Sequence, residues 1–504
     1  MANKIAKNTI YLYIRMIITI IISLYTSRVV LEALGVVDYG IYNVVGGIVA
    51  IISFLSSALS ASTSRFLSTA LGHSDQTELI RVFCTAKYIH RLFAVALLIL
   101  GETIGVWAVN HVLVIPESQI YAANWTFQLS LFATALALTQ IPYDALIVAH
   151  EDLHIFAYLQ ILSSLLKLGI VFLLMIISFN KLILYSILVF LVSIIIRTLY
   201  WGYAKRNYQE THSHAKVDKQ IVKQMASFSG WDLLGHIGFT ARQQGTNIVM
   251  NMFFGAAINA ASGLATTVQG IISSFAYNIV TAVRPQIIKS YATGDLQKFR
   301  SLIKNAIFAT LCMIMLICIP LILNLHTVLT IWLKNIPDYC YQFTLYCLIG
   351  CIVSSISSVF LIGIHATGDV KRSSLGRNII YILSLFCIFL FLKMSFPPTC
   401  AYIIFIITQL MTLCNDVYIL HSVLSPQIIR NILFQNVAII TIGMICGIIA
   451  YYITIENTFL KVIISTLVYI LTFIPFVFFI VTNSSQKKMI IELIKAKLNF
   501  IWVI

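Results

Sequence analysis

Fourteen apolar runs follow one another along the chain, each long enough to cross a bilayer as a helix. A membrane-spanning helix needs about 20 mostly apolar residues. Hydrophobic residues make up 60% of the 504 residues and charged residues only 10%, against roughly 25% charged in ordinary soluble domains. The sequence therefore predicts an all-α polytopic membrane protein. The runs lie near 8–32, 40–63, 84–108, 121–147, 156–178, 182–203, 227–250, 257–283, 304–326, 341–364, 377–396, 398–421, 431–453 and 460–482.

Lysine and arginine divide unevenly between the two sides of these spans. With the N-terminus in the cytoplasm, the inner segments hold 24 Lys and Arg, and the outer segments hold only Lys181, Lys334, Lys393 and Lys461. This is the positive-inside rule, so we expect both termini in the cytoplasm. It accounts for the net charge of +15 without a nucleic-acid partner. The basic start lacks a cleavage pattern and is expected to lead into a retained first span.

The ten cysteines are scattered and form no CxxC pair, so neither a zinc site nor a redox motif is indicated. Most are expected to be buried thiols in helices. A disulfide between Cys340 and Cys400, near the outer face, is the open alternative.

An internal repeat relates two stretches at an offset of about 219–222 residues. It pairs Gly35 with Gly255, Arg65 with Arg284, Asp75 with Asp295 and Arg81 with Arg300. The offset equals six spans, so both copies face the same way, as in transporters built from two parallel lobes. We expect an N-lobe at 1–205, a cytoplasmic linker at 206–226 and a C-lobe at 227–424. Spans 13 and 14 and an amphipathic tail on the membrane surface are expected within 425–504.

Polar side chains recur at helical spacing in two spans. Ser53, Ser56, Ser60 and Ser64 follow one face of span 2, and Asn259, Ser262, Thr266, Ser273, Tyr277 and Thr281 approximate one face of span 8. Their equivalent places in the two lobes favour a wet central cavity. The alternative is close helix packing through small residues.

Ionisable residues inside spans are costly and mark function by default. Arg15, Arg28, Lys167 and Arg242 are predicted to line a basic cavity with Asn259 and Thr266. Asp232 and His236 lie four residues apart and, with Glu32, are candidates for ion coupling. A structural hydrogen bond is the alternative for Asp232 and His236. Asp144, Arg197 and Asp416 lie near span ends, where snorkelling is the expected explanation. A basic cavity favours an anionic substrate such as a phosphate or pyrophosphate.

Fourteen spans, twin six-span lobes and a cationic cavity accompany the segment SRVVLEALGVVDYGIYNVVGGIVAIISFL. With its LG-x-x-D-Y-G-I-Y stretch at Leu34–Tyr42, this chain resembles the bacterial Wzx-type O-antigen or capsule repeat-unit flippases. These belong to the MOP superfamily, which also contains the MATE multidrug and toxin extruders. The resemblance implies two parallel six-helix lobes around a central cavity plus two C-terminal helices, in the bacterial cytoplasmic (inner) membrane.

The resemblance also implies a function without covalent chemistry. An undecaprenyl-pyrophosphate-linked oligosaccharide would cross the membrane by alternating access for surface polysaccharide biosynthesis, with proton or sodium coupling as one option and no cofactor. Membrane lipids and other polysaccharide assembly proteins are the further partners expected. A cation-coupled multidrug extruder is the first alternative and predicts a more acidic cavity. A membrane enzyme such as a ligase, polymerase or acyltransferase is the second, but the outer loops are short. Lipid II flippases are close relatives that this sequence does not separate.

Overall fold

The computed structural model describes residues 2–53, 55–72, 75–177, 179–213, 215–453, 457–482 and 486–487. Within these, it describes the backbone but not the side chains of residues 2–14, 55–58, 61, 72 and 228–236. The predicted surface helix of the tail therefore lies almost wholly outside the described residues. The described part is helical and contains no strand, which confirms the all-α prediction.

The chain forms two compact units. The first comprises Met1–Leu264, Pro337–Cys340 and Tyr381–Ala401, and the second comprises Ala265–Ile336, Tyr341–Ile380 and Tyr402–Ile504. Eight helices of the described chain lie wholly within the first unit. They and the short turns between them are α1 (Ala2–Ile52), α2 (Leu55–Gly72), α3 (Gln76–Leu100), a π-helical turn (Gly101–Gly105), α4 (Val106–His111), a 3-10 turn (Glu117–Gln119), α5 (Ile120–Ala149), α6 (Leu153–Ile176), α7 (Lys181–Asn207), a 3-10 turn (Gln209–Thr211) and α8 (Lys219–Phe254). The remaining helices are α9 (Ala256–Ala292), α10 (Leu296–Leu323), α11 (Leu325–Trp332), α12 (Cys340–Thr367), α13 (Val370–Lys393), α14 (Thr399–Leu424), α15 (Pro426–Tyr451), α16 (Thr458–Phe476) and a π-helical turn (Val477–Val481).

Two glycines break the helical path at equivalent places. Gly35 has φ 80° and ψ 171° inside α1, and Gly255 has φ 74° and ψ −173° between α8 and α9. This backbone region is essentially restricted to glycine. Asp75 caps α3 through the amides of Thr77 and Glu78, and Asp295 caps α10 through the amide of Lys298. The sequence repeat pairs Gly35 with Gly255 and Asp75 with Asp295. In the structure each pair shares its role, so the repeat extends to backbone conformation and helix caps.

The number of spans agrees with the sequence. Eleven helices of the described chain are long and apolar enough to cross a membrane. The helix α1 counts once among them, although Gly35 divides it into two segments. The helices α8 and α9 have 36 and 37 residues but are more polar. Counting both segments of α1 and adding α8 and α9 gives the predicted fourteen, with α2 continuing from the second segment.

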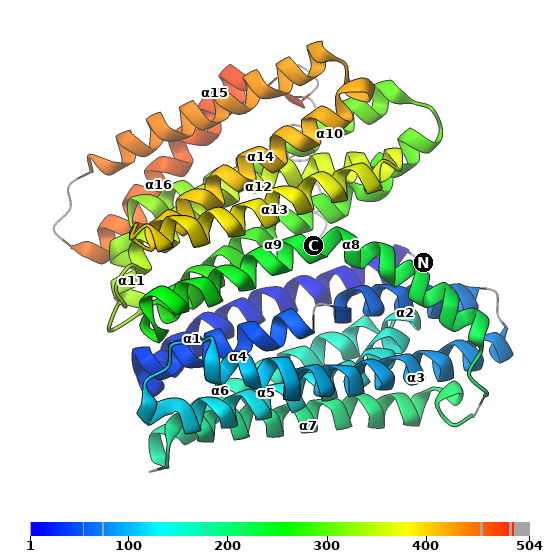
Figure 1. Ribbon diagram of the computed structural model, residues 1–504. Coiled ribbons are helices and arrows are strands. Elements are labelled where there is room, and N and C mark those ends of the chain that lie inside the picture. Colours follow the sequence, from blue (N-terminus) through cyan, green and yellow to red (C-terminus); the bar gives the residue numbers. More distant parts are fainter. Residues whose placement is uncertain are drawn as a thin grey trace. The chain divides into compact units, whose positions relative to one another are not determined.

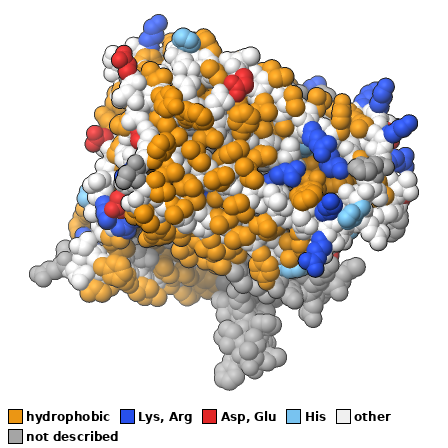
Figure 2. Space-filling model, turned by 90° about the horizontal axis from the view of Figure 1, so that it is seen from below, with side chains coloured by type: hydrophobic (Ala, Val, Ile, Leu, Met, Phe, Trp, Pro, Cys, Tyr) orange, Lys and Arg blue, Asp and Glu red, His pale blue; other side chains and the backbone are white. Residues whose placement is uncertain are grey.

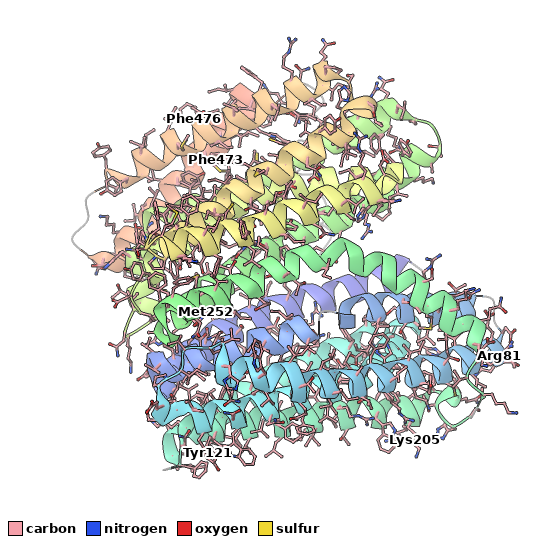
Figure 3. The ribbon with its side chains drawn as sticks, in the orientation of Figure 1. Arg81, Tyr121, Lys205, Met252, Phe473 and Phe476 are labelled. Atoms are coloured by element: carbon pink, nitrogen blue, oxygen red, sulfur yellow. The ribbon has the colours of Figure 1, made fainter. Side chains whose placement is uncertain are left out.

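In the first unit, α3, α5 and α7 run side by side (Figure 1). Their contact surface is apolar, and Ala123, Phe127 and Leu131 of α5 are fully buried. Arg81 and Lys205 lie at one end of these helices and Tyr121 lies at the other (Figure 3). These two residues, both among the predicted inner Lys and Arg, thus share one end of the unit.

In the second unit, α15 packs against α10 and α16. Gly443 of α15 faces Met315 and Tyr469, where a larger side chain would collide. The Tyr469 hydroxyl donates to the Met315 carbonyl at 3.2 Å, and the Asn324 amide donates to the Ser465 hydroxyl at 3.0 Å. The C-terminal helix pair is therefore joined to α10 by both apolar and polar contacts.

The exposed surface is that of a membrane protein. Figure 2 shows a face dominated by hydrophobic side chains, with Lys and Arg gathered mainly toward one side. Aromatic and aliphatic residues such as Phe434, Ile176 and Phe479 are largely exposed, at 78%, 77% and 72%. In water such a surface would aggregate, whereas lipid chains solvate it.

The segment between α7 and α8 is fastened to the loop after α5. Glu210 is only 2% exposed and pairs with His150 at 2.5 Å, while the Tyr208 hydroxyl donates to Asp152 at 2.7 Å. Burial acts to raise the pKa of Glu210, but its bonds to His150 and Gln76 outweigh burial and leave the pKa below its usual value. The predicted linker at 206–226 is therefore ordered where the structure describes it.

All ten cysteines are free. Cys340 and Cys400 are both buried thiols, so the disulfide alternative is wrong in this structure.

Candidate functional site

A polar pocket of about 250 Å³ lies in the first unit between α1, α6 and α7. The break at Gly35 lets both segments of α1 contribute to its wall. Its polar lining consists of Ser23, Thr26 and Ser27 before the break, Tyr39, Tyr42 and Asn43 after it, Ser164 and Lys167 of α6, and Tyr185 of α7. A helix without the break could not present residues 23–27 and 39–43 to one pocket so readily.

Lys167 carries the only full charge among the residues that line this pocket. Its side chain is accessible, and no side chain of the described chain forms an ion pair or hydrogen bond with it. Lys167 lies fourteen residues after Leu153 and nine before Ile176, so it is about 21 Å and 14 Å from the two ends of α6. A lysine side chain cannot easily snorkel over such distances.

The hydroxyl groups around Lys167 differ in their hydrogen bonding. Ser27 donates to backbone carbonyls of α1, and Ser164 donates to the Gln160 carbonyl at 3.1 Å. Their oxygen lone pairs remain available as acceptors. The Thr26 hydroxyl oxygen is buried without a hydrogen-bond partner. The pocket therefore offers both acceptors and an unused donor.

Tyrosines close the other side of the pocket. Tyr42 and Tyr185 meet edge to face with ring centroids 5.0 Å apart. The Asn43 amide donates to the Tyr39 carbonyl at 2.8 Å. The ring contact thus joins α1 to α7 at the pocket wall.

Arg15 lies apart from this pocket, nearer the beginning of α1. Its guanidinium donates to Gln160 Oε1 at 2.9 Å and lies 5.6 Å from the Phe156 ring centroid. Arg15 and Asp144 both act electrostatically on the buried Tyr200. The structure thus brings Arg15 and Asp144 into one polar cluster among α1, α5, α6 and α7.

The snorkelling expectation applies differently to its three residues. Asp144 accepts from Gln140 at 3.1 Å, and Arg197 donates to the Thr139 hydroxyl at 3.3 Å. Both are half-buried and bound to neighbouring helical side chains. Asp416 is 0% exposed, so snorkelling is wrong for it.

Arg28 and Glu32 follow Ser27 on α1 but do not line the pocket. Arg28 is half-buried and Glu32 is exposed. Their predicted roles in substrate binding and ion coupling stay predictions.

Arg242 of α8 is 6% exposed and lies against two aromatic rings. Its guanidinium carbon is 5.9 Å from the Phe239 centroid and 5.8 Å from the Tyr381 centroid. Cation–π contacts stabilise a buried guanidinium. The side chains of Asp232 and His236, predicted for ion coupling on the same helix, lie outside the described residues.

Asn259 is fully buried at the turn between α8 and α9. Its amide donates to the Asn247 carbonyl at 2.8 Å, and its oxygen accepts from Asn251 at 3.0 Å. Ser262 donates to Asn247 at 2.6 Å. In this conformation the helix-packing alternative describes Asn259 and Ser262 better than a wet cavity does. Thr266 is half-buried and belongs to the second unit.

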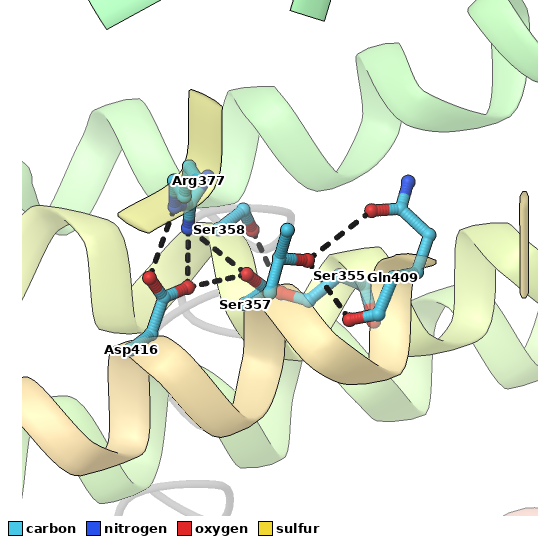
Figure 4. Close-up of polar contacts among 7 residues, drawn as sticks. Ser355, Ser357, Ser358, Arg377, Gln409 and Asp416 are labelled. Atoms are coloured by element: carbon cyan, nitrogen blue, oxygen red, sulfur yellow. Dashed lines mark hydrogen bonds and ion pairs between the residues drawn. The ribbon is translucent and has the colours of Figure 1, made fainter. Parts of the chain in front are cut away.

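The second unit contains a buried ion pair that the sequence pattern does not predict, because Arg377 stands at the start of the apolar run 377–396 and counts among the 24 inner Lys and Arg. Arg377 lies inside α13 and Asp416 inside α14. Arg377 Nε donates to Asp416 Oδ1 at 2.9 Å, and a second guanidinium nitrogen contacts Oδ2 (Figure 4). Ser357 of α12 donates to Oδ2 at 2.6 Å and accepts from Arg377 at 3.0 Å. The lone Asp of span 12 was the only signal that a partner was needed.

In the first unit, the structure therefore separates the predicted residues into distinct places. Lys167 lies in the pocket, Arg15 in the polar cluster, Arg242 in an aromatic cage and Asn259 in a turn. Among the described residues, no group of three or more His, Cys, Asp or Glu could hold a metal ion.

The chain is similar to known proteins in its structure but not detectably in its sequence. No family model matches the sequence, and no curated protein matches it. The lipid II flippase MurJ in an inward closed conformation matches with a TM-score of 0.67 at 12% identity, covering 94% of this chain and 99% of its own. An inward-facing MATE multidrug resistance transporter of the MOP superfamily matches with a TM-score of 0.63 at 11% identity, covering 82% and 98%. The MATE multidrug transporter DinF-BH matches with 0.63 at 14% identity, covering 84% and 96%. The chain has the fold of these MOP-superfamily transporters.

Proposed function

We propose that this chain is a flippase that moves an undecaprenyl-pyrophosphate-linked oligosaccharide across the bacterial cytoplasmic membrane by alternating access, for surface polysaccharide biosynthesis. The observation that carries the proposal is the match with a lipid II flippase over 94% of the chain. The O-antigen or capsule pathway rests on the sequence resemblance.

The two C-terminal helices favour a flippase over a multidrug extruder. The MATE transporters match along 95–98% of their own length but leave 16–19% of this chain uncovered. Residues 425–504, which contain α15 and α16, form about 16% of the chain. The uncovered share is thus the size of this helix pair, whereas the MurJ match leaves only 6% uncovered.

The charge of the membrane-embedded side chains points in the same direction. Arg15, Lys167 and Arg242 lie within helices of the first unit, and the pocket there contains no carboxylate. Arginine binds phosphate oxygens in a bidentate manner. These residues suit an anionic cargo, which pyrophosphate is and a cationic drug is not.

A multidrug extruder is the second candidate, favoured by the matches with MATE transporters at a TM-score of 0.63. The two functions predict different phenotypes. Deleting the gene should remove surface polysaccharide while the lipid-linked oligosaccharide accumulates on the cytoplasmic face. Increased drug sensitivity with intact surface polysaccharide would refute the flippase and support the extruder.

Site variants test the cationic residues in the same strain. Arg15→Ala and Arg242→Ala should abolish complementation while leaving the protein in the membrane. Arg206→Ala, which removes an exposed charge at the end of α7, should complement fully. Full activity of both arginine variants would contradict an essential role of Arg15 and Arg242.

A further inference from the structure

The pocket between α1, α6 and α7 has a chemistry of its own, distinct from that of the arginines. We propose that it binds one carboxylated sugar residue, such as a uronic acid unit. The inference rests on the proposed function, because it names a constituent of the oligosaccharide cargo. Three properties of the pocket lead to it: charge, hydrogen-bonding capacity and size.

The charge calls for a single anionic group. Lys167 is the only lining residue with a full charge, and no described side chain pairs with it. An ammonium group so deep in a membrane costs several kcal/mol unless a partner or water compensates it. One ammonium balances one carboxylate, whereas a pyrophosphate carries more charge than it can neutralise. The ligand is therefore a monoanion.

The hydrogen-bonding capacity calls for a ligand that both donates and accepts. Ser27 and Ser164 use their protons on backbone carbonyls and offer acceptor lone pairs. The buried Thr26 hydroxyl has no partner and can donate. A buried hydroxyl without a partner costs about 1–3 kcal/mol. Sugar hydroxyls satisfy both kinds of group, whereas a halide or acetate ion leaves the acceptors unused.

The volume and walls agree with one sugar ring. The pocket holds about 250 Å³, just below the range of about 300–1,000 Å³ typical for drug-sized ligands. It is far larger than a single ion needs, since one water takes about 30 Å³. The rings of Tyr39, Tyr42 and Tyr185 provide an aromatic wall. A pyranose carries apolar C–H faces that pack against such rings.

Direct binding to the purified full-length protein tests the proposal. The probes are methyl glucuronide, methyl glucoside, which lacks only the carboxylate, and sodium acetate, which lacks only the sugar. Calorimetry should detect glucuronide binding, with glucoside and acetate each at least tenfold weaker. Lys167→Gln should weaken glucuronide binding about 10- to 100-fold, as expected for a charge-assisted hydrogen bond. Lys181→Gln, the same change at the exposed start of α7, should bind like the wild type.

Two conservative variants keep the test valid if Lys167→Gln fails to fold. Lys167→Arg keeps the charge and should retain binding, and Thr26→Val keeps the shape and should weaken it. Equal binding of glucuronide and glucoside, or unchanged binding in Lys167→Gln, would refute the site. Equal binding of acetate and glucuronide would mean a simple anion site and refute the sugar. This readout is binding and does not depend on transport. If the purified protein binds the glucuronide through Lys167 but deletion of the gene leaves surface polysaccharide intact, the flippase proposal is refuted and the uronide site stands.

Discussion

Breaking the ion pair between Arg377 and Asp416 should be among the most destabilising single changes in the second unit. Asp416 is 0% exposed and the Arg377 side chain 14%. Removing one partner of a buried pair leaves the other charge uncompensated, at a cost of about 3–5 kcal/mol. The Ser357 hydroxyl also bonds to both groups and would lose one partner. We therefore expect Arg377→Met and Asp416→Leu each to lower the free energy of unfolding by about 3–5 kcal/mol.

The double variant Arg377→Met/Asp416→Leu gives the decisive comparison. Apolar residues of similar volume often replace a buried pair at little cost. The double variant should therefore be much more stable than the sum of the single changes implies, with a coupling of at least about 2 kcal/mol.

Equilibrium unfolding in a detergent and denaturant mixture measures all four proteins. Arg372→Met is the matched control, because Arg372 is an exposed arginine of α13 whose contact is the Tyr418 ring at 5.0 Å. It should change stability by no more than about 1 kcal/mol. Single changes below about 1 kcal/mol, or strictly additive ones, would refute the reasoning about the pair.

Two further predictions concern the backbone breaks and the linker. Gly35→Ala and Gly255→Ala force a side chain into a positive-φ conformation and should each lower the free energy of unfolding by about 1–3 kcal/mol. Gly46→Ala is the control, at a helical position with open space, and should be neutral or stabilising. Equal effects at all three positions would contradict the shared break. Glu210→Gln should lower stability above pH 4.5, because a lowered carboxylate pKa adds stability above the unfolded value. That difference from the wild type should shrink as the pH falls below 4.5, and a difference that persists at lower pH would exclude the carboxylate charge as its source.

The fold could be predicted well from the sequence because a membrane helix is recognised from its own run of apolar residues. Apolar runs and the Lys and Arg distribution each depend on nearby residues, so they gave the spans without tertiary information. The repeat could be recognised in the sequence because Gly35 and Gly255 both occupy a positive-φ backbone conformation that favours glycine. Boundaries were less accurate, and α8 begins at Lys219 rather than near 227, because its polar first turns do not resemble a span.

The site was predicted less well because side-chain partners come from distant helices. Arg377 counts among the inner Lys and Arg in the sequence, since nothing in α13 indicates Asp416, 39 residues away. Asn259 was expected in a wet cavity, but its partner Asn247 lies across the α8–α9 turn. Spacing on one helix defines a face, and only packing decides whether that face meets another helix or water.

Translocation by the purified protein tests the flippase proposal most directly. The protein is reconstituted into liposomes that contain an undecaprenyl-pyrophosphate-linked oligosaccharide with a fluorescent sugar. A membrane-impermeant quencher then reports the fraction on the outer face over time. Wild-type liposomes should exchange the lipid-linked sugar between leaflets faster than protein-free liposomes, and Arg15→Ala liposomes should not. Exchange no faster than in protein-free liposomes, together with transport of a cationic dye, would contradict the account.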